Sequence, residues 1–112
     1  CHRQCALDNK CRHAFYKCYF YIEPKHLKEG WSRDRIIDEI NAMNIPCFQG
    51  GCSEVYLEKA FDDVGFRPRH RLSVAKELGE TSIMFLVHPT LTKDNLDCMV
   101  NGVGDLLDQA TV

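Results

Sequence analysis

Two runs of strand-forming residues constrain this chain most. Residues 13–23 (HAFYKCYFYIE) are rich in aromatic side chains, and Pro24 ends the run by removing a backbone donor. Alternation along such a strand puts Ala14, Tyr16, Cys18, Phe20 and Ile22 on one face. Residues 81–87 (TSIMFLV) form a short, continuous apolar run that Pro89 bounds. A sheet of two or three strands cannot bury both of its faces by itself. Helices must therefore cover one face. We therefore expect a two-layer α+β domain, with a small, mostly antiparallel sheet of two or three strands and helices on one face.

The segments between and after these runs carry helix signals. Ser32 is a plausible N-cap for a helix that stops near Asn44, because Pro46 favours an extended shape before it. A short extended piece follows over residues 45–48, and residues 49–52 read as a turn. Three further helices are expected: one capped by Ser53 with Val55, Leu57 and Phe61, one through Leu72, Ala75 and Leu78 that ends at Gly79, and a last one capped by Thr92.

Composition narrows the class of protein. The 112 residues suit one domain, and the mixture of 45% hydrophobic and 27% charged residues is typical of a globular chain. With a formal net charge of -2, the chain lacks the basic excess of nucleic-acid binders, and no apolar run approaches membrane-spanning length. Seven irregularly spaced cysteines favour a reducing, cytoplasmic compartment. We expect a flexible segment over residues 1–12 and one domain over residues 13–112; because Cys1 is not Met, we expect a cut or processed piece.

The ordered set of segments resembles a known family. The run at 13–23, residues 33–56 (RDRIIDEINAMNIPCFQGGCSEVY) and residues 78–103 (LGETSIMFLVHPTLTKDNLDCMVNGV) are similar in order and spacing to the C-terminal part of the DegT/DnrJ/EryC1/StrS family of sugar aminotransferases. The resemblance implies the small domain of a fold-type-I enzyme that uses pyridoxal phosphate (PLP). Such enzymes transfer an amino group, typically from glutamate, to a nucleotide-linked keto sugar.

The resemblance also implies partners. The family's large domain holds PLP through a Schiff-base lysine, which has no counterpart here, so the isolated chain is expected to be inactive and to bind no PLP. Lys17, Lys59 and Lys76 are expected at the surface or at strand edges. The missing large domain should dock on an exposed apolar face, for which the Phe15 side of the first strand is the candidate. A second subunit is expected as well, because the family usually forms homodimers.

The turn after the short extended piece is the candidate substrate site. It consists of Phe48, Gln49, Gly50, Gly51, Cys52 and Ser53. The two glycines permit close approach of a ligand to the backbone, and amides before a helix beginning at Ser53 could donate to an anionic nucleotide sugar. By position in the family this loop lies near the cleft. The competing interpretation is a plain turn that leads into a helix.

Other readings stay open at the level of sequence. The early cluster of Cys1, Cys5, Cys11 and His13 could ligate zinc, although it lacks repeated ligand pairs. The aromatic side chains of the first strand could stack nucleic-acid bases, but packing in a core or domain interface is favoured. His88 could point into a cleft or simply end its strand. The alternative to an aminotransferase piece is a stand-alone α+β ligand-binding or interaction module.

Overall fold

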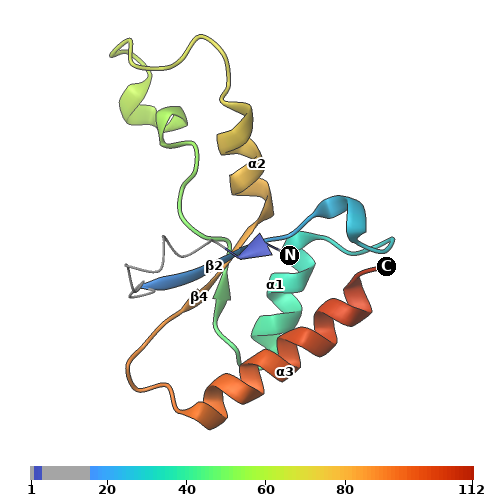
Figure 1. Ribbon diagram of the computed structural model, residues 1–112. Helices are drawn as coiled ribbons and strands as arrows, with labels where there is room; N and C mark the ends of the chain where they lie inside the picture. Colours follow the sequence, from blue (N-terminus) through green and yellow to red (C-terminus); the bar gives the residue numbers. More distant parts are fainter. Residues whose placement is uncertain (1, 4–15) are drawn as a thin grey trace, which may run out of the picture.

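The computed structural model describes residues 2–3 and 16–112 (Figure 1). Its strands are β1 (His2–Arg3), β2 (Lys17–Tyr21), β3 (Cys47–Phe48) and β4 (Ser82–Leu86), its α-helices are α1 (Arg33–Ala42), α2 (Ser73–Thr81) and α3 (Lys93–Ala110), and its 3-10 turns are η1 (Pro24–His26), η2 (Val55–Leu57) and η3 (Lys59–Phe61). No helix among these residues is long and apolar enough to cross a membrane.

The described strands form one sheet in the order β1-β2-β4-β3. All three pairings are antiparallel, and the central pair joins β2 to β4 with Cys18 opposite Phe85 and Phe20 opposite Ile83. The α+β class with an antiparallel sheet is therefore confirmed. The two-residue strand β1 is an addition to the expected set. It lies within the segment 1–12, most of which falls outside the described residues, and the division at residue 13 stays a prediction.

The alternation expected for the first strand decides which side chains enter the core. Cys18, Phe20 and Ile22 share the face that carries Ile83 and Phe85 of β4, and the Phe20 and Phe85 rings meet edge to face at 5.8 Å. Helices α1 and α3 lie on this side of the sheet (Figure 1). The buried core consists of Ile22, Ile36, Ile37, Ile40, Ile45, Cys47, Ile83, Phe85, Leu106 and Ala110.

Both predicted caps of the core helices are present. The Ser32 hydroxyl accepts from the Arg35 amide at 3.1 Å and starts α1. Thr92 starts α3 with a reciprocal capping box, in which the Asn95 side-chain oxygen accepts a hydrogen bond from the Thr92 amide. At the other end of α1, Asn44 takes a φ of 59°, so the chain turns away before Ile45 enters the core.

The prediction that a helix begins at Ser53 is wrong. The chain forms the two 3-10 turns η2 and η3 instead, and the extended backbone of Glu58 separates them. The guanidinium of Arg67 donates to the carbonyls of Tyr56 (2.9 Å), Leu57 (2.9 Å) and Glu58 (3.3 Å). Those carbonyls are therefore bound to a side chain rather than to the amides of a following helical turn.

Residues 49–80, which we call the arm, leave the body of the domain. In Figure 1 this segment projects from the sheet, passes through η2 and η3, and returns along α2. Helix α2 therefore does not cover the sheet, contrary to the expectation that the helices pack on one face. Gly79, expected at the end of this helix, lies inside it, and the helix runs on to Thr81.

Candidate functional site

The predicted loop lines a hollow at the base of the arm, which we call the loop hollow. Residues 49–53 form one side, and Glu54, Lys76, Gly79 and Glu80 complete the lining. Its volume is about 400 Å³. Phe48 is the predicted site residue that does not line it, because its strand position places it opposite Met84, where its side chain is exposed. The structure thus brings five of the six predicted residues together without testing whether they bind substrate.

Gly50 fixes the shape of the loop. Its φ of 97° is one that residues with a Cβ rarely adopt, and a Cβ there would lie 2.9 Å from Ser82 Oγ and 3.0 Å from Tyr19 Cε1. The Ser82 hydroxyl donates to the Gln49 carbonyl at 2.5 Å and ties the loop to the start of β4. The close approach that the sequence suggested for these glycines therefore exists, and it is made to the protein's own sheet.

The Ser53 side chain packs against Gly79 of α2 rather than capping a helix. A Cβ added to Gly79 would collide with the Ser53 hydroxyl, so any larger residue at position 79 would force the serine side chain to move. Because no α-helix begins at Ser53, the predicted helix N-terminus for an anionic ligand is wrong. The loop could still bind a ligand through its backbone amides and carbonyls.

The charges around the loop hollow are mixed. Lys76 pairs with Glu80 at 2.7 Å along α2. Glu54 accepts two hydrogen bonds from the Arg71 guanidinium, at 2.7 and 2.5 Å, and a third from Tyr56 Oη at 2.7 Å. Arg71, and then Tyr56, lower the pKa of Glu54 to about 2, so this carboxylate is ionised at neutral pH. With two carboxylates and one ammonium group in its lining, the hollow suits hydroxyl-rich ligand parts better than a bare phosphate.

The described residues do not fit PLP. A Schiff-base lysine has to be desolvated or placed beside another cation, and no lysine among residues 16–112 is buried. Lys76, the lysine at the loop hollow, is held by Glu80. The same part of the chain contains no group of three or more metal-ligating side chains. The proposed zinc ligands Cys1, Cys5, Cys11 and His13 lie outside the described residues.

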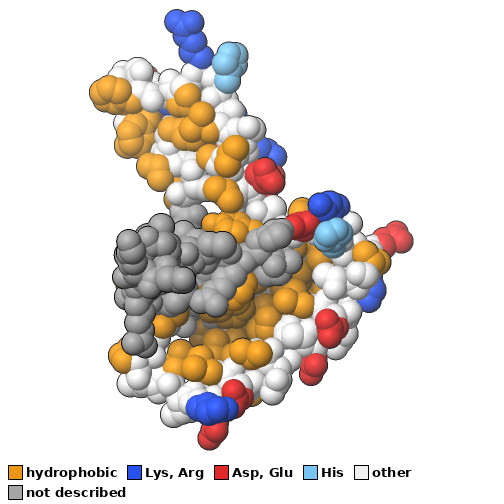
Figure 2. Space-filling model, viewed as in Figure 1, with side chains coloured by type: hydrophobic (Ala, Val, Ile, Leu, Met, Phe, Trp, Pro, Cys, Tyr) orange, Lys and Arg blue, Asp and Glu red, His pale blue; other side chains and the backbone are white. Residues whose placement is uncertain are grey.

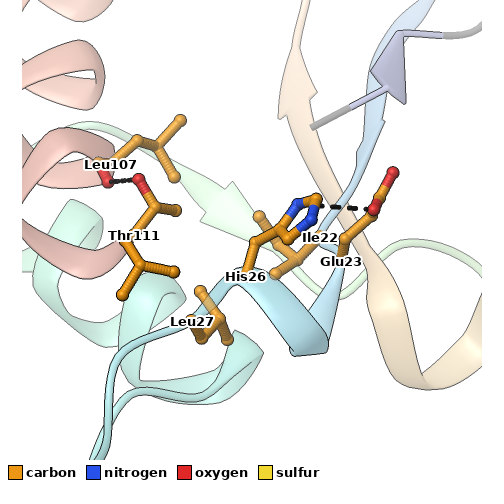
Figure 3. A pocket seen from close by; sticks show the side chains of 7 residues that line it. Ile22, Glu23, His26, Leu27, Leu107 and Thr111 are labelled. Atoms are coloured by element: carbon orange, nitrogen blue, oxygen red, sulfur yellow. Dashed lines mark hydrogen bonds and ion pairs between the residues drawn. The ribbon is translucent and has the colours of Figure 1, made fainter.

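His88 and His26 lie outside the loop hollow. His88 Nδ1 lies 2.7 Å from Thr90 Oγ1 in the exposed turn before α3, which matches the strand-end interpretation. His26 Nδ1 lies 3.4 Å from a Glu23 carboxylate oxygen. It lines a second hollow of about 330 Å³, shown in Figure 3, together with Ile22, Leu27, Leu107, Thr111 and Val112. The sequence contained no signal for this hollow, because its walls come from opposite ends of the domain.

Fold and loop together define a small two-layer α+β domain with a projecting arm and a hollow at its base. The domain is similar to part of the aminotransferase from Psychrobacter cryohalolentis, whose structure is known from X-ray diffraction. The match has a TM-score of 0.83 and 56% sequence identity, and it covers 88% of this chain. No protein-family model and no curated protein sequence matches the chain.

This chain spans 25% of the length of the Psychrobacter aminotransferase. At 56% identity the two sequences share their fold over the matched region, and the fold class is that of a piece of an aminotransferase. The resemblance to the DegT/DnrJ/EryC1/StrS family in particular stays a prediction.

Proposed function

We propose that this chain is the C-terminal small domain of a PLP-dependent aminotransferase that acts on a nucleotide-linked keto sugar. The observation that carries the proposal is the 56% identity to an aminotransferase over 88% of the chain, together with the shared fold. The sugar substrate rests on the family resemblance of the sequence. In this proposal the cofactor lysine belongs to another part of the enzyme, because the described lysines do not fit that role.

The domain would contribute one wall of the substrate cleft. Residues 49–53 supply backbone donors and acceptors on a loop whose shape Gly50 and Ser82 hold. Tyr19 lies beside this loop and could add an aromatic surface for a base or sugar ring. These groups would orient the substrate and exclude water, and none of them is proposed to take part in proton transfer.

The first test is the coding region upstream of Cys1. A reading frame that continues through a segment with a candidate PLP lysine should yield a longer product, and the purified product should show the visible absorbance of lysine-bound PLP. That product should form 2-oxoglutarate when supplied with glutamate and a nucleotide-linked keto sugar. A start codon directly before Cys1 would contradict the proposal and favour a stand-alone binding module.

A variant pair tests the loop. In the longer enzyme, Gly51→Val should raise KM for the nucleotide sugar, because the added side chain fills the loop hollow. Among residues 16–112, Tyr19 Oη is the one atom near a Cβ at position 51, at 3.7 Å. Asp38→Ala, at an exposed position of α1, should leave KM unchanged. Equal KM values for both variants and the parent would remove residues 49–53 from the substrate site.

A further inference from the structure

The arm contains no buried residue. From residue 48 to residue 80 every position is exposed or partly exposed, although the segment includes many apolar side chains. The radius of gyration of the domain is 16.5 Å, whereas roughly 13 Å is expected for a compact domain of about 100 residues. Figure 2 shows hydrophobic side chains gathered over the projecting part. An ordered segment of this length without a core of its own is typical of a surface that packs against something else.

Helix α2 shows the missing contact most clearly. Val74 and Leu78 are one helical turn apart and therefore share a face, yet they are 66% and 41% exposed. Among the residues of α2, Thr81 at its very end is the one that is buried. An amphipathic helix normally turns such an apolar face toward a core. In this chain nothing among the described residues covers it.

The apolar surface continues toward the tip of the arm. Phe66 is 76% exposed there, and the other large apolar side chains of the arm that are also exposed are Val55, Leu57, Val64 and Leu72. Scattered exposed apolar residues are ordinary, but here they occupy one continuous projection of the chain.

Polar ties give the arm its shape in place of a core. Arg71 binds Glu54 through two hydrogen bonds, and Tyr56 Oη accepts from the Leu72 amide at 3.0 Å. Arg67 adds the three carbonyl contacts described above and an ion pair with Asp62. The arm therefore presents its apolar side chains on a preformed framework, which lowers the entropy lost when a partner binds.

We propose that the apolar surface of the arm, residues 55–78, docks on the part of the aminotransferase polypeptide that this chain does not contain. The inference rests on the proposed function. The occupant follows from the comparison: the matched region is 25% of the Psychrobacter chain, so the remaining three quarters is the partner that a domain of this kind lacks. The docking face is then the arm, in contrast to the sequence-based expectation of the Phe15 side of the first strand, of which Phe15 itself lies outside the described residues.

The test uses a chimera in which this chain replaces the matching quarter of the Psychrobacter aminotransferase. Hydrogen exchange of the α2 amides (Ser73–Thr81) is compared between the isolated chain and the chimera, with α1 (Arg33–Ala42) as internal reference. Docking should slow exchange in α2 by about tenfold or more, whereas α1 should change little because it is already covered. Val74→Glu together with Leu78→Glu should restore fast exchange in the chimera.

Val100→Glu is the matched control, because Val100 on α3 is 70% exposed but lies outside the arm. It should leave the α2 protection intact. An active chimera with unprotected α2 would overturn the docking proposal and leave the proposed function standing. Protected α2 in a chimera without aminotransferase activity would support docking and count against the proposed function. A chimera that fails to fold while the parent enzyme folds would also count against docking. Dimers of the isolated chain that Val74→Glu abolishes would assign the surface to a second copy and overturn the proposal.

Discussion

Replacement of Arg33 by Met tests how the body of the domain holds the base of the arm. Arg33 is the first residue of α1, and its side chain is only 14% exposed. One terminal guanidinium nitrogen, Nη1, donates to the Gly79 carbonyl at 3.1 Å and to the Ser82 carbonyl at 2.9 Å. These acceptors flank the junction between α2 and β4, so one side chain links the first core helix to both elements. Methionine keeps most of the aliphatic stem and removes both hydrogen bonds.

The magnitude follows from the type of bond. A hydrogen bond from a charged donor contributes roughly 1.5–3 kcal/mol, and the two bonds here share one donor group. The substitution also relieves the desolvation cost of holding a cation in a largely covered position, which offsets part of this loss. We therefore expect the free energy of unfolding to fall by about 2–3 kcal/mol. For a domain of this size that corresponds to a decrease in Tm of roughly 10–15 °C.

Urea unfolding followed by far-UV circular dichroism measures this loss. The matched control is Arg35→Met, two residues along the same helix. Arg35 is exposed, donates to the Gly30 carbonyl at 3.1 Å and lies 4.3 Å from the centre of the Trp31 ring. Replacement of Arg35 should lower the free energy of unfolding by about 1 kcal/mol or less. If Arg33→Met were no more destabilising than Arg35→Met, the two hydrogen bonds from Arg33 to the base of the arm would add nothing to stability. That result would refute the reasoning.

Three further predictions concern the arm and the loop. Because the pKa of Glu54 is lowered to about 2 in the folded chain from an ordinary value of 4.5, the stability from its pairing with Arg71 is complete above pH 4.5 and is lost as the pH falls toward 2. The protection of the arm amides, corrected for the intrinsic exchange rate at each pH, should therefore fall over that window. An Arg71→Met variant should show a smaller change, because the Tyr56 hydrogen bond still favours the ionised carboxylate. Gly50→Ala should destabilise the chain by about 1–3 kcal/mol in thermal unfolding, because it places a Cβ on a residue with an unfavourable φ. Gly51→Ala is the control and should change stability by less than about 0.5 kcal/mol. Equal effects of the two variants would contradict the loop geometry. Burial raises the pKa of the Cys47 thiol, so this cysteine should resist alkylation at neutral pH while the exposed cysteines are modified. Mass spectrometry maps the labelled positions. Labelling of all these cysteines at equal rates would argue against the place of Cys47 in the core.

Local rules account for what the sequence predicted correctly. Alternation along residues 13–23 assigned Cys18, Phe20 and Ile22 to one face, and that face is the one in the core. Ser32 and Thr92 cap α1 and α3 because a hydroxyl one position before a helix reaches an amide three residues later. Each of these signals acts within a few residues, so no knowledge of the rest of the fold was needed.

The loop hollow shows where the sequence stops being informative. Its residues 49–53 could be singled out by their glycines, but the opposite wall comes from α2, more than twenty residues away. The Ser53 helix failed as a prediction because Arg67 takes the carbonyls that a helix would have used. A hydrogen bond between residues ten positions apart has no signature in local spacing.

The sequence by itself determined the class of the fold, the strand faces and the two principal helix caps, because these follow from side-chain periodicity and short-range hydrogen bonding. Only the tertiary structure decided that residues 49–80 leave the sheet as an arm. The helical pattern of Val74 and Leu78 indicates an apolar face, but amphipathicity cannot say whether that face meets the chain's own core or another part of a larger protein. That choice depends on which surfaces remain uncovered after α1 and α3 have packed on the sheet.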